Sequence, residues 1–324
     1  MSTAVRLRVP ADPKEHSRHI AEAAAAAWFN AYGGSQIETP LAVTAALAVA
    51  GAGGNPSWRL PEVLPRLSPA QFSAATDRLW LEWSIIRPDL VPAARLLWTG
   101  DGGSADARLR AIHAAGTAAL RAGVWEFGAD EYSRHGADLL GTQLQAMRSK
   151  KAAQGHGQFL TPECVAELLG RMVGVQEGRS VMEPCAGTGT MLLGAARAMR
   201  DQGLDPATVT WWANDIDPLA AALCAVNTHL WDLGHRVVVG CGDALIDDWT
   251  TSALNRRQAA IDELHEYVQV ARMEVALRSL LELPAEPDPL RDAIRQLFPK
   301  PPKRAPAHSD SFDAVAAHQQ PRLF

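Results

Sequence analysis

The sequence predicts an α/β fold in which a partial parallel sheet follows an all-helical amino-terminal domain. Residues 1–150 carry apolar side chains at helical spacing and show no strand pattern. Beyond them, short apolar runs alternate with alanine- and leucine-rich helical stretches, an order typical of parallel sheets. Glycines and acidic residues follow these apolar runs, where loops at the carboxyl edge of such a sheet would lie.

Five long helices are expected in the amino-terminal domain, separated by glycine-rich turns. They are predicted at residues 16–32, 40–52, 69–86, 105–122 and 132–151. Six of the ten tryptophans lie here: Trp28, Trp58, Trp80, Trp83, Trp98 and Trp125. Tryptophan at helical spacing usually belongs to a core, and we favour that role over the alternative, a stacking platform for unpaired bases.

The second predicted domain, residues 151–324, contains a strand followed by a glycine-containing turn. The segment VMEPCAGTGTM at residues 181–191 combines an apolar strand start, Glu183, a turn with Gly187 and Gly189, and the start of a helix. Glycines in such a turn let the backbone approach a ligand closely. Turns of this kind also occur for structural reasons alone, so the flanking segments decide between the two interpretations.

Two further apolar runs each end beside an aspartate. Residues 208–213 predict a strand that ends before Asp215 and Asp217, and residues 236–240 predict one that ends before Asp243. A carboxylate in this place accepts hydroxyl hydrogens of a ribose, and Asp215 is the first candidate, ahead of Asp217. Asp243 is placed to accept a hydrogen bond from an adenine amino group. Any one aspartate also fits a helix cap, but acids in register on successive strands favour a nucleotide pocket.

Four motifs occur in the order GQFLTP, EPCAGTGT, NDIDP and GDA between residues 157 and 244. In this order they resemble the cofactor-binding motifs of adenine-N6 DNA methyltransferases, especially the modification subunits of type I restriction systems. The resemblance covers about residues 138–245. It implies a Rossmann-like core that binds S-adenosylmethionine and transfers a methyl group to adenine N6 in DNA.

The resemblance also implies which residues bind the cofactor. The threonine and the aromatic residue of the first motif correspond to Thr161 and Phe159, and the acid before the glycine turn corresponds to Glu183. The ribose-binding acid corresponds to Asp215, and the acid that contacts adenine corresponds to Asp243. The full set is Phe159, Thr161, Pro162, Glu183, Pro184, Gly187, Thr188, Gly189, Asp215, Asp217 and Asp243.

The catalytic motif of that family, Asn-Pro-Pro-Phe or a close variant, does not occur in the sequence. The family needs it because the exocyclic amine of adenine is a poor nucleophile, which an amide oxygen and a carbonyl must hold while an aromatic ring stacks on the flipped base. The closest literal match is Asn-Pro-Ser-Trp at residues 55–58. No apolar strand precedes it, so we interpret it as an ordinary turn.

The carboxyl-terminal run offers the other replacement for this motif. Residues 312–317 predict a strand that would lead into the catalytic position. Weak candidates for catalytic residues follow it: His318, Gln319, Gln320 and Pro321. We interpret the run as a decayed catalytic motif, with activity through Gln320 as the alternative.

A helical insertion at about residues 250–308 separates the third predicted strand from the last. Its main element is one long helix at residues 251–283, about 50 Å in length. The apolar stripe of this helix is Ile261, Leu264, Val268, Val275, Leu277, Leu280 and Leu281. The four predicted strands leave an open sheet edge, so we expect a partner subunit or a homodimer to cover it.

Composition constrains the partners and the compartment. The formal net charge is −5, so DNA binding would depend on a local basic face, at residues 148–156 or 300–304. The four cysteines, Cys164, Cys185, Cys224 and Cys241, lack metal-ligand spacing, and we expect buried reduced thiols and no metal. The sequence shows neither a signal peptide nor an apolar stretch that would span a membrane, which predicts a cytoplasmic protein.

Two classes of function remain open. The first is a site-specific DNA adenine-N6 methyltransferase of a restriction-modification system, whose catalytic motif is divergent or supplied by another polypeptide. The second is a catalytically inactive pseudo-methyltransferase that serves as a cofactor-binding or DNA-binding partner subunit. Both fit the sequence, because the cofactor motifs are present and the catalytic motif is missing.

Overall fold

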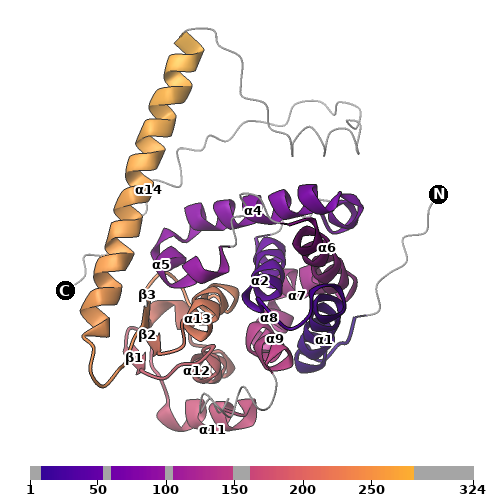
Figure 1. Cartoon of the computed structure of the whole chain (residues 1–324). Coiled ribbons are helices and arrows are strands. Elements are labelled where there is room, and N and C mark those ends of the chain that lie inside the picture. Colours follow the sequence, from indigo (N-terminus) through magenta and orange to yellow (C-terminus); the bar gives the residue numbers. More distant parts are fainter. Residues whose placement is uncertain (1–8, 54–59, 99–104, 149–160, 281–324) are drawn as a thin grey trace, which may run out of the picture. The chain divides into compact units, whose positions relative to one another are not determined.

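The structure, a computed structural model, describes residues 9–53, 60–98, 105–148 and 161–280 (Figure 1). These residues fall within one compact unit. They are mostly helical and contain a parallel sheet of three strands in the order β1-β2-β3. The predicted class, α/β with a partial parallel sheet, agrees with this architecture.

Short and long helices precede the sheet. They are α1 (Pro13–Tyr32), α2 (Glu38–Ala52), α3 (Leu60–Val63), α4 (Pro69–Ile86), α5 (Val91–Ala94), α6 (Asp106–Arg121), α7 (Val124–Ala129), α8 (Glu131–Gly136) and α9 (Leu139–Met147), with the 3-10 turns η1 (Leu64–Arg66), η2 (Pro88–Leu90) and η3 (Arg95–Leu97). The elements that follow are α11 (Glu163–Val173), β1 (Ser180–Glu183), α12 (Thr190–Asp201), η4 (Pro206–Thr208), β2 (Thr210–Asp215), α13 (Pro218–Leu230), β3 (Val237–Cys241) and α14 (Trp249–Leu280).

Four of the five helices predicted in the amino-terminal region are confirmed, as α1, α2, α4 and α6. The single helix predicted at residues 132–151 is wrong. Two helices, α8 and α9, occupy this stretch because Ala137 is extended (φ −154°, ψ 157°) and the Asp138 carboxylate caps the start of α9. Helical spacing does not predict the short helices α3, α5 and α7, which are too brief to show a period.

The second and third strands lie one or two residues later than the apolar runs predict. β2 begins after the 3-10 turn η4 and continues through Asn214 and Asp215. Polar residues extend this strand because its parallel ladder aligns Asn214 with Gly240 and Asp215 with Cys241. On the other side, Glu183 at the end of β1 aligns with Ala213. The acids therefore lie at the carboxyl ends of neighbouring strands.

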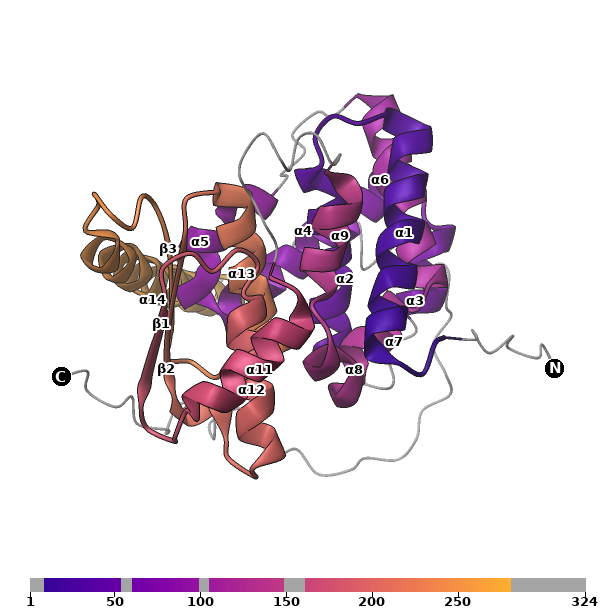
Figure 2. The same cartoon turned by 90° about the horizontal axis from the view of Figure 1, so that it is seen from below.

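Helix α13 lies at the centre of the unit. It packs on β2 and β3 and also contacts α2, α5 and η3, so nearly all of its side chains are buried. Its sequence, PLAAALCAVNTHL, suits this position because small and aliphatic side chains cover its whole circumference. Figure 2 shows α11, α12 and α13 on one face of the sheet. The domain boundary expected near residue 150 stays a prediction.

Three tryptophans of the helical region form part of the core. Trp28, Trp80 and Trp83 are each at most 3% exposed, which confirms the core role for these residues. Trp80 and Trp83 also pack edge to face, with ring centroids 5.3 Å apart. Trp98 and Trp125 are half-buried. Trp58, for which a core role was also predicted, lies outside the described residues.

A buried ion pair lies where η2 meets α14. Arg87 donates from Nε and Nη2 to the two carboxylate oxygens of Asp89, both at 2.9 Å, and the two side chains are 3% and 6% exposed. Arg257, near the start of α14, lies 4.0 Å from the same carboxylate. The pair therefore lies between η2 and α14, which contact each other and leave it little access to water.

Helix α14 is continuous over 32 residues, which confirms the long helix predicted there. Its first turns pack on the sheet, where Trp249 and Ala253 are buried beside Val238 of β3. Farther along, the described stripe positions Ile261, Leu264 and Val268 are only half-buried. The remaining stripe side chains and residue 281 lie outside the described part of the chain. No helix in the described residues is both long and apolar enough to span a membrane.

Helices α11 and α12 cross at close range through glycines. A Cβ added to Gly170 would lie 2.5 Å from the backbone of Gly194, and one added to Gly194 would lie 2.3 Å from the carbonyl oxygen of Ala166. Both distances are far below van der Waals contact. Only glycine therefore permits this crossing, and the Glu167–Arg197 ion pair at 2.6 Å supports it from the side.

We predict that Gly194→Ala destabilises the protein although alanine is the better helix former. The gain in helix propensity is about 1 kcal/mol, whereas overpacking against a backbone atom costs about 1–3 kcal/mol. The expected net loss of unfolding free energy, measured in a urea titration, is therefore up to about 2 kcal/mol. The control is Gly34→Ala, where the nearest atom would be a Phe29 ring carbon at 3.7 Å, and which should leave the midpoint unchanged.

Candidate functional site

Asn214 joins the loops that follow the three strands. Its side-chain amide donates from Nδ2 to the carbonyl oxygens of Pro184 and Gly242, at 3.2 and 2.9 Å. Its backbone carbonyl accepts from the amide of Ala186 at 2.8 Å. Asn214 is buried on the central strand, so one side chain holds the β1 and β3 loops on either side of β2.

The glycine turn after β1 has the backbone conformation that the sequence predicts. Gly187 and Gly189 have φ values of +57° and +95°, in the left-handed region that favours glycine. A Cβ at Gly187 would meet nothing within 4 Å, so this side of the turn is open. A Cβ at Gly189 would lie 2.9 Å from Trp231 and 3.1 Å from Cys224. Gly187 therefore faces free space, and Gly189 packs the turn onto the body.

The structure separates the two aspartates of the NDIDP motif by role. Asp215 accepts backbone amides from both sides, Gly187 N at 2.7 Å and Asp217 N at 2.9 Å. A carboxylate has about four acceptor positions, so Asp215 keeps capacity for two further donors. Asp217 instead caps α13 through Leu219 N, at 3.0 Å, and pairs with Arg148 at 2.6 Å. This arrangement favours Asp215 as the ligand-binding acid.

Glu183 and Asp243 complete a row of carboxylates at the edge of the sheet. Glu183 accepts the amide of Cys185 at 3.1 Å, and Asp243 accepts the amide of Leu245 at 2.9 Å. Ile216, 69% exposed, lies directly after Asp215 and offers an apolar surface. Carboxylates that accept hydroxyl and amino hydrogens, beside an apolar side chain and an open glycine turn, fit a nucleoside-type cofactor.

Behind the glycine turn lies a buried carboxylate that the predicted site does not include. Asp138 is 4% exposed and accepts hydrogen bonds from two hydroxyls of the turn, Thr188 at 2.6 Å and Thr190 at 3.1 Å. It also accepts from the backbone amide of Gly141 at 2.7 Å and from Asn227 of α13 at 2.8 Å. Burial raises the pKa of the Asp138 carboxyl, and these hydrogen bonds oppose that rise.

The Asp138 network, defined as Asp138, Thr188, Thr190 and Asn227, connects three separate parts of the chain. Asp138 begins α9, the two threonines flank Gly189, and Asn227 also donates to the carbonyl of Thr188 at 2.9 Å. The Thr188 side chain is thus directed into the body. An aspartate before a helical run is a cap signal that would locate the start of α9, but nothing in the sequence indicates its contacts 50 to 89 residues away.

Some predicted site residues lie outside the described part of the chain. These are Phe159 of the first motif and the catalytic candidates His318, Gln319, Gln320 and Pro321. Thr161 and Pro162 are described at the start of α11, where Pro162 precedes the first helical residue. The roles expected for both motifs therefore stay predictions, as does the turn at residues 55–58.

The cysteines differ from the prediction of buried thiols in two cases. Cys164 and Cys185 are exposed, because they lie at the outer start of α11 and in the loop after β1. Cys224 is buried in α13 and Cys241 is partly buried at the end of β3. All four are free thiols.

Comparison with known proteins finds a similarity over part of the chain. Residues 138–265 match the model of the N-6 DNA methylase family. The matching segment begins at Asp138, includes β1, β2 and β3, and continues into α14, beyond the limit near residue 245 indicated by the motifs. No curated protein matches the chain.

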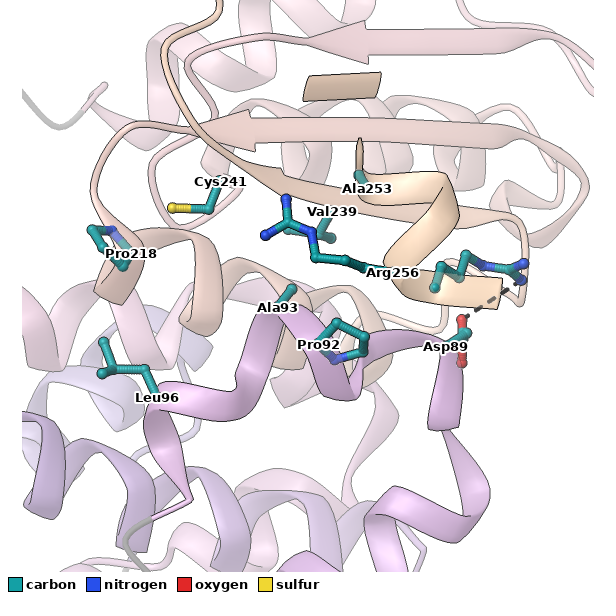
Figure 3. Close-up of a pocket in the computed structure, with 10 residues that line it drawn as sticks. Asp89, Pro92, Ala93, Leu96, Pro218, Val239, Cys241, Ala253 and Arg256 are labelled. Atoms are coloured by element: carbon teal, nitrogen blue, oxygen red, sulfur yellow. Dashed lines mark ion pairs between the residues drawn. The ribbon is translucent and has the colours of Figure 1, made fainter. Parts of the chain in front are cut away.

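A pocket of about 200 Å³ lies next to the candidate site but is separate from it (Figure 3). Its lining residues are Asp89, Pro92, Ala93, Leu96, Pro218, Val239, Cys241, Ala253, Arg256 and Arg257. Glu183, Asp215 and Asp243 do not contribute to it. Asp89 is paired with Arg87, Arg256 donates to the carbonyl of Ser252, and Arg257 donates to the carbonyl of His235, so each charged group at this pocket has a partner within the chain. We therefore place the candidate site at the strand loops.

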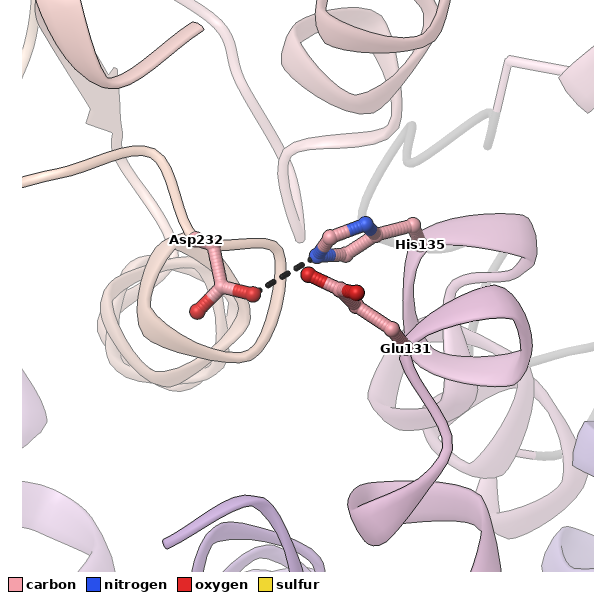
Figure 4. A group of neighbouring side chains, drawn as sticks. All are labelled: Glu131, His135 and Asp232. Atoms are coloured by element: carbon pink, nitrogen blue, oxygen red, sulfur yellow. Dashed lines mark hydrogen bonds and ion pairs between the residues drawn. The ribbon is translucent and has the colours of Figure 1, made fainter. Parts of the chain in front are cut away.

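A polar cluster at the other end of α13 has metal-ligand residue types. Glu131, His135 and Asp232 converge in Figure 4, with one ligand atom from each within 4.8 Å of the others. Arg134 donates to Oδ2 of Asp232 at 2.6 Å, and His135 Nε2 lies 2.8 Å from the same oxygen. A guanidinium at that oxygen opposes a further cation. We interpret the cluster as an ion-pair clasp between α8 and the turn after α13.

We predict that Asp138→Asn lowers the free energy of unfolding by about 2–3 kcal/mol, which is the cost of leaving buried polar groups without hydrogen-bond partners. Asparagine has the same shape, but its NH₂ group faces donors that a carboxylate accepts. The matched control is Asp130→Asn. Asp130 caps α8 at an exposed position, where asparagine caps equally well, so that variant should unfold at the wild-type urea concentration.

The ion-pair clasp predicts a pH dependence of stability. Partial burial acts to raise the pKa of Asp232, but hydrogen bonds from His135 and Arg134 outweigh it and lower the pKa from 3.8 to about 2. The contribution of the clasp to the free energy of unfolding is therefore fully present above about pH 4 and is lost as pH falls toward 2. Because the Asp232 side chain is 47% exposed, we expect this contribution to the free energy of unfolding to be about 1 kcal/mol or less.

Urea titrations of the wild type and Asp232→Asn between pH 6 and pH 2.5 would measure this contribution. Asn tolerates the left-handed backbone of this position (φ +51°), so the substitution isolates the charge. The two proteins should differ at pH 6 and converge at low pH. A difference that stays constant over the whole range would contradict the clasp.

Proposed function

We propose that the chain is an S-adenosylmethionine-binding protein of the DNA adenine-N6 methyltransferase type with a Rossmann-like core. The observation that carries the proposal is the row of carboxylates and the open glycine turn at one sheet edge, within a segment that matches the N-6 DNA methylase family. The cofactor, when bound, supplies a methyl group activated by its sulfonium. Family and geometry support the same class of ligand independently.

Each acid of the site has a distinct proposed task. Asp215 accepts the ribose hydroxyls, since the amides of Gly187 and Asp217 orient its carboxylate and leave acceptor positions free. Asp243 accepts from the adenine amino group, and the exposed Ile216 side chain supplies an apolar contact for the ring. Glu183 lies before the glycine turn and balances the positive charge of the cofactor.

The methyl-transfer step requires groups that the described site does not contain. Adenine N6 needs acceptors for its two hydrogens, so that its lone pair is directed at the methyl group and the leaving proton has a destination. The acids named above are assigned to the cofactor, and the Asn-Pro-Pro motif does not occur in the sequence. Gln320 and Pro321 are the candidates that this chain offers.

Two forms of the function therefore stand. In the first, the chain transfers methyl groups to adenine N6 in DNA, with a divergent motif or with one from another polypeptide. In the second, it is an inactive pseudo-methyltransferase that binds cofactor or DNA for a partner subunit. The missing motif favours the second form chemically, and the family match favours the first. DNA, a partner subunit and a restriction-modification context belong to both proposals.

Calorimetric titration with S-adenosylmethionine tests the cofactor site. Asp215→Ala removes the proposed ribose acceptor and should weaken binding about 10- to 100-fold, the scale of one or two hydrogen bonds to a charged group. Asp262→Ala, which removes an exposed carboxylate of α14 that accepts from Gln258, is the matched control and should bind normally. A wild-type protein that shows no binding would overturn the proposal.

A tritiated-methyl transfer assay on unmethylated DNA separates the two forms of the function. Transfer that is lost in Gln320→Ala, with cofactor binding retained, would establish an enzyme that uses the carboxyl-terminal run. Cofactor binding without transfer would identify the isolated chain as the non-catalytic form. In the second case, addition of a separate methylase polypeptide that restores transfer would show that the motif is borrowed.

A further inference from the structure

The pocket of Figure 3 lies between two parts of the described chain. One wall comes from η2, α5 and η3, and the other comes from β3, the start of α13 and the first turns of α14. At about 200 Å³ it is smaller than the pockets of drug-sized ligands, which begin at about 300 Å³. Six of its ten lining residues are apolar: Pro92, Ala93, Leu96, Pro218, Val239 and Ala253. The pocket therefore suits a small molecule with an apolar part.

Arg256 of α14 supplies hydrogen-bond donors to this pocket. Its Nε donates to the carbonyl oxygen of Ser252, one turn earlier on the same helix, at 3.3 Å. A guanidinium has five N–H donors in a planar fork, so this bond uses only one of them. Figure 3 shows the Arg256 side chain extending from α14 toward Cys241. The terminal nitrogens of Arg256 are thus placed to donate to a ligand.

The charge of Arg256 acts on the thiol at the far side of the pocket. Burial raises the pKa of the Cys241 thiol, and the positive charge of Arg256 opposes that rise. The negative charges of Asp215 and Asp217 act on the same thiol in the opposite direction to Arg256. Cys241 can therefore report on what occupies the space beside Arg256.

Positive charge exceeds negative charge around the pocket. Two arginines, Arg256 and Arg257, and one acid, Asp89, line it. Both oxygens of Asp89 accept from Arg87, which adds another positive charge behind the wall. The buried Nε–H of Arg257 has no acceptor in the part of the chain that the structure describes. A local positive excess in a chain of net charge −5, together with a donor that lacks an acceptor, favours an anionic ligand.

We propose that this pocket binds a small organic carboxylate. The carboxylate accepts from the terminal nitrogens of Arg256, and the apolar part of the ligand lies against Ala93 and Val239. The planar fork of an arginine matches the two oxygens of a carboxylate. Inorganic anions have no apolar part for the lining, and a neutral molecule would leave the positive charge unbalanced. The binding site is distinct from the proposed cofactor site, and ligand binding here does not require methyl transfer.

Alkylation of the cysteines tests the preference for anions in the full chain. The thiolate displaces iodide from iodoacetate and from iodoacetamide, which have nearly the same size, but only iodoacetate is an anion. The ratio of the iodoacetate rate to the iodoacetamide rate should be about tenfold higher at Cys241 than at Cys164 and Cys185, the scale of one charge-assisted hydrogen bond. The exposed Cys164 and Cys185 are internal controls, and peptide mapping by mass spectrometry separates the sites.

Two matched substitutions test the role of the guanidinium. Arg256→Gln should abolish the excess of iodoacetate reaction at Cys241. The control is Arg110→Gln, which removes an exposed arginine of α6 that also donates one turn back, to Asp106, and which should keep the excess. Both arginines are exposed, so we expect both variants to fold.

Protection of Cys241 in the wild-type protein tests the class of ligand. 4-Methylpentanoate, at about ten times its dissociation constant, should slow the iodoacetamide reaction of Cys241 about tenfold. The neutral 4-methylpentanamide and inorganic phosphate, at the same concentration, should leave the rate unchanged. None of the three compounds should protect Cys164 or Cys185.

Four results would overturn the proposal. Equal rate ratios at Cys241, Cys164 and Cys185 would mean that the pocket does not prefer anions. A ratio that Arg256→Gln leaves unchanged would mean that the guanidinium does not bind the anion. Equal protection by the amide or by phosphate would contradict the class of ligand. Protection of Cys241 by S-adenosylmethionine would make the pocket part of the cofactor site, which the Asp215→Ala titration tests separately.

Discussion

The buried carboxylate of Asp138 is the constraint on which the rest of the site depends. A charge at 4% exposure is tolerated only when donors satisfy it. Here the donors are two hydroxyls from the glycine turn, an amide from α13 and the first turn of α9. Satisfying one carboxylate therefore fixes three segments relative to one another. The turn that faces the proposed cofactor is rigid because its rear side is part of this network.

Residues at the end of the central strand β2 fix the front of the glycine turn, on the side that faces the proposed cofactor. Asn214 holds the loops after β1 and β3, and Asp215 accepts the amide of Gly187. The motif NDIDP thus divides its polar residues among three tasks: loop attachment for Asn214, the proposed ligand contact for Asp215 and helix capping for Asp217. Adjacent residues take different tasks because side chains alternate across a strand and the chain then turns into α13.

The helical region does more than precede the sheet. Two charged contacts join it to residues 138–265: the clasp at Asp232 and the approach of Arg257 to the Arg87–Asp89 pair. Apolar packing of α13 on α2 and α5 lies between them. In the described residues the helices α11, α12 and α13 pack on one face of the sheet and the first turns of α14 pack on the other (Figure 2).

Much of the fold could be predicted from local pattern. Helical spacing located α1, α2, α4, α6 and α14, and apolar runs located the strands to within two residues. The acids at the strand ends follow from the same runs, because parallel strands bring their carboxyl ends to one edge. Motif order was sufficient to indicate the family that the comparison supports. These features depend on residues that are close in sequence.

The sequence by itself determined the class of fold and the row of acids at the strand ends. Only the tertiary structure decided which aspartate is free for a ligand, since Asp217 is engaged by a helix start and by Arg148. It also decided that Asp138 supports the turn and that α11 presents its apolar side outward. The physical reason is the same in each case: hydrogen-bond partners and burial come from residues dozens of positions away, which no local pattern contains.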